Sequence, residues 1–153
     1  MNIEMITHLE DDDMDQGINK EHKGSVLVVD DEEGMRFTLN HYLTQAGYRV
    51  RQAADIAEAV LIVAEERFDA AIIDRVLSNG RNGLHLSRIM REIMPSCKTI
   101  LVSAWPTVDS AIQAMRYQVF GYLSKPIRKD DLLAIIEQAL RTDIREQKHA
   151  FGK

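Results

Sequence analysis

Cysteine is almost absent from this sequence, and long apolar runs are missing altogether. The single cysteine, Cys97, cannot form a disulfide within the chain, which is typical of proteins from a reducing compartment. No apolar run approaches the roughly 18 residues needed to cross a bilayer. The N-terminus also lacks the basic start and apolar stretch of a secretory signal. We therefore predict a cytoplasmic protein that does not associate with membranes.

An excess of positive charge is missing too. The 153 residues carry 19 Lys and Arg side chains against 24 Asp and Glu, a formal net charge of −5. Residues 1–23 alone account for this imbalance, and residues 24–153 carry equal numbers of acids and bases. Without an overall basic field, we expect no direct binding of nucleic acid by this segment. We predict an acidic, disordered tail over 1–23, one folded domain over 24–145 and a helix end or linker over 146–153.

From residue 25 onward, short apolar runs alternate with segments of helical periodicity. The expected strands cover residues 25–29, 48–52, 68–73, 99–102 and 120–124, and a helical pattern follows each of them. Strands that are apolar throughout and are separated by helices are typical of a parallel sheet covered on both faces. The predicted fold class is therefore α/β: a doubly wound, five-stranded parallel sheet with helices on both faces.

Local signals refine several of these helices. Asp55 is placed to cap the second helix. The third helix is expected to turn four apolar side chains inward: Leu86, Ile89, Met90 and Ile93. The fourth is marked by residues at helical spacing: Val108, Ile112 and Met115. Cys97 precedes the fourth strand, where we expect a small packing residue and not a nucleophile.

Chemically active side chains stand at the ends of four of the strands. Asp30 and Asp31 follow the first strand, Asp74 the third, Ser103 the fourth and Lys125 the fifth. In an open α/β sheet, ligands bind beyond the carboxyl ends of the strands. Carboxylates gathered there repel one another unless a cation such as Mg²⁺ balances them, and Mg²⁺ prefers carboxylate, water and phosphate oxygens. The pattern predicts a Mg²⁺ site where phosphoryl transfer onto an aspartate takes place.

Four motifs, in this order, resemble the signature of the receiver domains of response regulators in two-component signalling. They are Val28-Val29-Asp30-Asp31-Glu32, Ile72-Ile73-Asp74, Leu101-Val102-Ser103-Ala104 and Tyr122-Leu123-Ser124-Lys125-Pro126. The resemblance covers roughly residues 25–145 and implies the strand order 2-1-3-4-5. It also implies a signalling switch, not an enzyme in the usual sense, that accepts a phosphoryl group from a sensor histidine kinase or phosphotransfer protein.

The resemblance also implies a role for each site residue. Asp74 would be the phosphoacceptor, and Lys125 would neutralise the phosphoryl group. Asp31 would bind Mg²⁺ directly and Asp30 partly through water, while the backbone carbonyl of Val76 would supply a further ligand.

Two residues would carry the switch. Ser103 would swing toward the phosphoryl group, and Tyr122 would rotate inward when it does. A cis peptide bond would join Lys125 to Pro126. The readout surface would be formed by the fourth helix, fifth strand and fifth helix, through which an output domain or target binds or a homodimer forms after phosphorylation.

The sequence departs from the family pattern around the site. Ser78 stands where the family usually has proline, Gly83 comes one residue late, and Gln118 replaces a glycine at a helix stop. Trp105 occupies a position that is often small or polar, and Val76 lies across the pocket from it. We hypothesise that these two rim residues limit the access of water to the acyl phosphate; the alternative is that Trp105 packs on the fourth helix.

Two other classes of protein share parts of this pattern. A haloacid-dehalogenase-type Mg²⁺-dependent phosphatase also uses a strand-end aspartate, but it needs an Asp-x-Asp that neither Asp30 nor Asp74 begins. A flavodoxin-like FMN binder would bind phosphate in the loop after the first strand. In this sequence that loop begins with four acids, Asp30 to Glu33, which would repel a phosphate group. Within the receivers, a stand-alone protein and the receiver of a longer transcriptional regulator both fit the sequence.

Overall fold

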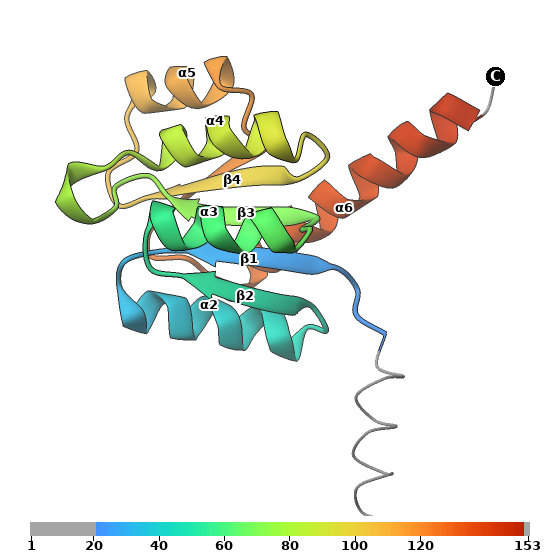
Figure 1. The fold of residues 1–153 in the computed structure, drawn as a ribbon, viewed down its shortest axis with the longest axis horizontal. Coiled ribbons are helices and arrows are strands. Elements are labelled where there is room, and N and C mark those ends of the chain that lie inside the picture. Colours follow the sequence, from blue (N-terminus) through green and yellow to red (C-terminus); the bar gives the residue numbers. More distant parts are fainter. Residues whose placement is uncertain (1–20, 152–153) are drawn as a thin grey trace, which may run out of the picture.

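The described part of the chain forms one twisted parallel sheet. In this computed structural model, the structure describes residues 21–151, without the side chains of Asn79 and residues 142–151. The strands are β1 (Ser25–Val29), β2 (Arg49–Ala53), β3 (Ala70–Asp74), β4 (Lys98–Ser103) and β5 (Gly121–Ser124). They pair in the order β2-β1-β3-β4-β5, all parallel, which confirms the predicted fold class and strand order (Figure 1).

Helices connect the strands and cover both faces of the sheet (Figure 1). They are α2 (Glu33–Gln45), α3 (Ile56–Glu65), the short 3₁₀ helix η1 (Ser78–Gly80), α4 (Gly83–Ile93), α5 (Val108–Arg116) and α6 (Lys129–Phe151). Helices α3, α4 and α5 pack on one face and α2 and α6 on the other. The predicted cap of α3 is confirmed, because the Asp55 carboxylate accepts the Glu58 N–H at 2.8 Å.

The two-residue repeat of the strands divides the core between these faces. Leu27 and Val29 of β1 pack beneath α3 and α4, whereas Val26 and Val28 pack against α2 and α6. Every residue of β3 is buried, as the continuous apolar run predicts. The first residues after these buried strands are therefore held firmly at the carboxyl edge of the sheet.

The boundaries differ slightly from the prediction. The expected third strand at 68–73 is observed at Ala70–Asp74, because ladder pairing with β1 and β4 begins at Ala70. Phe68 is buried before the strand starts. The prediction that Ile93 points inward was wrong: α4 ends there, and the chain turns so that Met94 is buried instead. Cys97 is buried and packs in the core, as expected.

Helix α5 presents its apolar side to solvent. Val108 and Met115 are 77% and 76% exposed, whereas the residues that face the sheet are Ser110 and Ala114. Thr107 and Ser110 form a reciprocal capping box, which fixes how the helix begins. The apolar spacing therefore identified the helix, but it marks an exposed surface.

Part of the predicted organisation lies outside the described residues. This applies to most of the acidic tail, and the division at residues 23 and 145 stays a prediction. Among residues 21–151, no helix is both long and apolar enough to cross a membrane.

Candidate functional site

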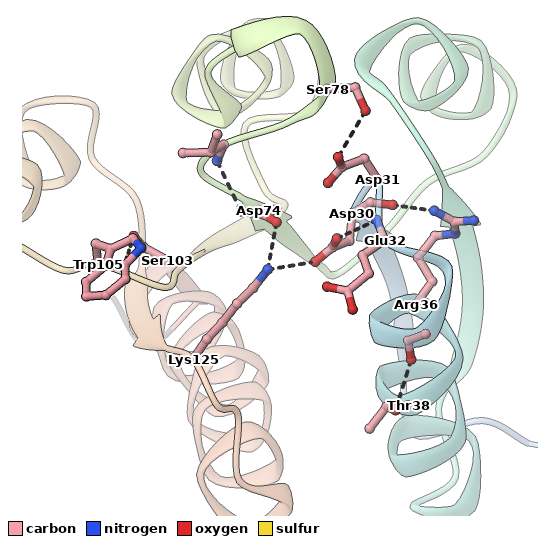
Figure 2. Close-up of polar contacts among 12 residues, drawn as sticks. Asp30, Asp31, Glu32, Arg36, Thr38, Asp74, Ser78, Ser103, Trp105 and Lys125 are labelled. Atoms are coloured by element: carbon pink, nitrogen blue, oxygen red, sulfur yellow. Dashed lines mark hydrogen bonds and ion pairs between the residues drawn. The ribbon is translucent and has the colours of Figure 1, made fainter.

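Three aspartates converge at the carboxyl edge of the sheet. Asp74 ends β3, and Asp30 and Asp31 follow β1, which pairs directly with β3. One carboxylate oxygen from each of the three lies within 4.8 Å of the others (Figure 2). Neighbouring parallel strands end at the same level, so their register alone brings these side chains together.

Lys125 reaches this cluster from the end of β5. Its Nζ donates a hydrogen bond to Asp74 Oδ2 at 2.8 Å and lies 3.5 Å from Asp30 Oδ2. Burial alone would lower the pKa of the ammonium, but the bond to Asp74 and the charge of Asp30 outweigh it and raise that pKa above its ordinary value. Lys125 is therefore firmly charged, and the expected cis peptide bond to Pro126 is present.

Asp30 is the most deeply buried of the three acids, with 2% of its surface exposed. Its Oδ1 accepts the Glu32 N–H at 2.9 Å, and its backbone carbonyl accepts the Arg36 guanidinium at 2.6 Å. Burial raises the pKa of Asp30 from 3.8 to about 6, and the neighbouring Asp74 carboxylate adds to the increase, against the opposing effects of the Glu32 N–H and Lys125. In the absence of a metal ion, Asp30 therefore holds its negative charge at an energetic cost.

Asp74 and Asp31 differ in their surroundings. Asp74 is buried, and its Oδ1 accepts the Val76 N–H at 3.1 Å. Asp31 is exposed, and its Oδ2 accepts a hydrogen bond from the Ser78 hydroxyl at 3.0 Å. The contact with Ser78 and the one from Arg36 to Asp30 were missed from the sequence, because the first depends on how the loop after β3 folds and the second on how the first turn of α2 lies against the end of β1.

Ser103 and Tyr122 make their hydrogen bonds outside the carboxylate cluster. The buried Ser103 hydroxyl accepts the Trp105 N–H at 3.2 Å, and Figure 2 shows this pair on the β4 side of the site. The half-buried Tyr122 shares a hydrogen bond of 3.2 Å with Ser110 of α5. Trp105 is 82% exposed, so it is not packed on α5, and Val76 is 62% exposed.

Gly83 allows the loop after Asp74 to pass close to the site. A Cβ atom at Gly83 would collide with the backbone carbonyl of Asp74. The N–H of Gly83 donates a hydrogen bond to the Arg75 carbonyl at 2.7 Å. Asn82 caps α4 by accepting the Leu84 N–H at 3.0 Å. Although Gly83 comes late in the loop, it is the residue that permits this close approach.

The donor set fits a hard divalent cation. Three carboxylates supply only oxygen atoms, and a single ammonium does not balance three negative charges. Mg²⁺ and Ca²⁺ prefer such ligands, and Mg²⁺ keeps several waters when one or two carboxylates bind it. The pKa of Asp30 is raised mainly by burial and further by the neighbouring Asp74 carboxylate, so a cation bound here would relieve the cost of keeping it ionised.

The fold and the site together define a class of protein: an open α/β domain with three clustered aspartates and Lys125 at the carboxyl edge of its sheet. The response regulator receiver domain model matches residues 26–137. This chain therefore belongs to the response regulator receiver domain family, which confirms the resemblance drawn from its four motifs. The comparisons support neither the phosphatase nor the FMN-binding alternative.

A curated relative is similar to this chain over most of its length. It is 33% identical over 126 residues to the DNA-binding transcriptional regulator NtrC of Proteus hauseri, covering 82% of this chain and 26% of that protein. The chain thus spans about a quarter of the length of this curated relative.

Solved receiver structures have the same fold. A CheY-like response regulator receiver domain protein of Methanospirillum hungatei superimposes with a TM-score of 0.76 at 25% identity, covering 80% of this chain and 97% of that one. A Burkholderia pseudomallei response regulator with a phosphorylated aspartic acid and a calcium ion gives a TM-score of 0.70 at 29% identity, covering 80% and 72%.

Proposed function

We propose that Asp74 accepts a phosphoryl group from the phosphohistidine of a sensor kinase or phosphotransfer protein. An Asp74 oxygen attacks phosphorus, the P–N bond breaks, and the imidazole leaves with the electron pair as an acyl phosphate forms. The observation that carries the proposal is the 2.8 Å contact of Lys125 with Asp74 inside the three-carboxylate cluster. The ammonium is placed to neutralise an incoming phosphoryl oxygen.

We propose that Mg²⁺ is the cofactor, held by Asp31 directly, by Asp30 partly through water, and by Asp74 and the Val76 carbonyl. Mg²⁺ would neutralise the phosphoryl oxygens and the carboxylates that surround them. The Burkholderia pseudomallei relative, which carries a phosphorylated aspartic acid with a calcium ion, supports this assignment.

The switch would use two hydroxyl groups that already have other partners. For Ser103 to reach a phosphoryl group, its hydroxyl must give up the Trp105 N–H; for Tyr122 to turn inward, it must leave Ser110. Phosphorylation would therefore shift an equilibrium between two sets of hydrogen bonds, because the dianion is better held with Ser103 turned toward it.

We propose that the α5–β5–α6 face, defined by Val108–Arg116, Gly121–Ser124 and Lys129–Phe151, transmits this change. An output domain or target protein would bind there, or a second copy would after phosphorylation. Membership of the receiver family and the similarity to a transcriptional regulator support the proposal that this domain controls the output of a longer regulator. The phosphoryl transfer would take place in the cytoplasm.

The test is chemical labelling. With acetyl phosphate and Mg²⁺, we expect about one phosphoryl group per chain on the wild-type protein, none on Asp74→Asn, and unchanged labelling of Asp109→Asn, an exposed acid on α5. Chelation of Mg²⁺ should abolish the label. Equal labelling of Asp74→Asn and wild type would reject Asp74 as the acceptor.

The labelled protein also tests the rim hypothesis. Trp105 and Val76 are both exposed apolar groups, and their backbone N–H groups bond to Ser103 and Asp74, two residues of the proposed phosphorylation site. If they limit the access of water, the Trp105→Glu variant should lose its phosphoryl group several times faster than the wild type. An unchanged half-life would show that Trp105 does not protect the acyl phosphate.

A further inference from the structure

The Ser78 hydroxyl donates a hydrogen bond of 3.0 Å to Asp31 Oδ2 across the mouth of the site (Figure 2). The two residues are 47 positions apart, one in the loop after β3 and the other in the loop after β1. Ser78 is also the position at which the family usually has proline, whose side chain has no hydrogen-bond donor. The contact therefore depends on a residue at which this sequence departs from the family pattern.

The loop that carries Ser78 is held in place by nested backbone pairs. The Gly83 N–H bonds to the Arg75 carbonyl at 2.7 Å, and the Leu77 N–H bonds to the Arg81 carbonyl at 2.8 Å. Val76 and Asn82 form an antiparallel bridge between these two pairs.

The tip of the loop is equally well defined. Gly80 supplies the left-handed backbone of the turn, with φ of 70°. Leu77, directly before Ser78, is only 3% exposed and anchors the loop in the core. Ser78 is thus presented to Asp31 from a fixed support.

We propose that Ser78 is a positioning residue that orients the Asp31 carboxylate for the metal ion. The proposal rests on the function inferred above, in which Asp31 binds Mg²⁺ directly. A carboxylate has about four acceptor sites on its two oxygens, so the bond from Ser78 leaves others free for the ion. An exposed aspartate that is already held in one rotamer loses less conformational entropy when the ion binds.

The contact contributes little to the stability of the fold. Ser78 and Asp31 are both exposed, and both line a cavity of about 300 Å³ that is also bounded by Asp55 and Arg81. If the bond is removed, water can satisfy both side chains and no buried polar group is left without a partner, so its loss should not unfold the protein. Its effect should therefore appear in metal affinity and not in melting of the metal-free chain.

Calorimetric titration with MgCl₂ tests the proposal on the full chain. We expect Ser78→Ala to bind Mg²⁺ about tenfold more weakly than the wild type, as other outer-shell substitutions do. Ser78→Thr, which keeps the hydroxyl, should restore most of the affinity. Thr44→Ala removes an exposed hydroxyl on α2 that bonds to Asn40, and it should leave the affinity unchanged. The melting temperature without Mg²⁺ should be the same for all four proteins.

The outcomes separate this proposal from the proposed function. If the wild type binds Mg²⁺, Asp31→Asn does not, and Ser78→Ala binds as well as the wild type, Asp31 remains a ligand but the role of Ser78 is overturned. The same role is rejected if Ser78→Thr binds as weakly as Ser78→Ala. If the wild type itself binds no Mg²⁺, the proposed metal site falls, and the positioning role falls with it.

Discussion

At the residue scale, Asp30 is a buried carboxylate whose negative charge destabilises the folded protein. Its carboxylate is buried beside Asp74, the Lys125 ammonium lies 3.5 Å from it, and its pKa is raised to about 6. An acid whose pKa is higher in the folded than in the unfolded chain binds its proton more tightly when folded. Its negative charge therefore opposes folding above that pKa, and this cost disappears as the pH falls from about 6 toward 3.8.

We predict that the metal-free wild type gains stability on mild acidification. Between about pH 7.5 and about pH 5, its melting temperature should rise by roughly 5 °C relative to that of Asp30→Asn. The variant lacks the titrating group and serves as the baseline for all other ionisations. Differential scanning calorimetry in the presence of a chelator measures the difference.

Saturating Mg²⁺ should remove this pH-dependent gain, because the ion binds the deprotonated carboxylate and stabilises the fold near neutral pH. If wild type and Asp30→Asn respond alike to acid without metal, the charge on Asp30 does not oppose folding.

At the scale of the element, helix α5 ends with an unusual residue at the position that follows its C-cap. Gln118 adopts φ of 55°, the left-handed conformation that usually belongs to glycine. The Val119 N–H bonds to the Ala114 carbonyl at 3.1 Å and the Gln118 N–H to the Met115 carbonyl at 3.0 Å, which is the Schellman pattern. The helix stop is therefore complete, but its central residue carries the steric cost of a Cβ atom.

We predict that Gln118→Gly stabilises the protein by about 0.5–1 kcal/mol, because relief of the steric cost exceeds the extra entropy of glycine in the unfolded chain. The matched control is Gln113→Gly in the interior of α5, which should destabilise by about 1 kcal/mol. Urea unfolding gives both values. A loss of stability in Gln118→Gly would mean that its side chain contributes more than its backbone conformation costs.

The same helices show what sequence patterns predict and what they do not. The strand–helix order, the strand order and the cluster of acids followed from apolar runs, from the family motifs and from the rule that parallel strands end at one edge. The inward position of Ile93 did not, because periodicity does not say at which residue a helix ends. The contact of Ser78 with Asp31 depends on loop folding, for which the sequence carries no periodic signal.

At the scale of the whole molecule, the exposed side of α5 departs from a simple pattern of apolar core and polar surface. Its apolar residues lie on the α5–β5–α6 face, with Met115 and Val108 mostly exposed and Ile112 44% exposed. The helix instead turns Ser110 inward, where it pairs with Tyr122 of β5. The surface and the proposed switch thus share one helix, so a change at Tyr122 can alter what α5 presents.

We predict that phosphorylation shifts the wild type from monomer toward dimer. Met115→Glu should prevent this, because the dimer interface would have to bury the new carboxylate. Because Met115 is already 76% exposed, the variant should keep its free energy of unfolding within about 0.5 kcal/mol and should label on Asp74 as fully as the wild type. Light scattering after acetyl phosphate treatment measures the mass.

Leu61→Glu changes a similarly exposed residue on α3, outside the α5–β5–α6 face, and should still dimerise. Dimerisation of Met115→Glu, or its failure in Leu61→Glu alone, would move the interface away from α5, because only a surface that becomes buried on association is sensitive to a new charge.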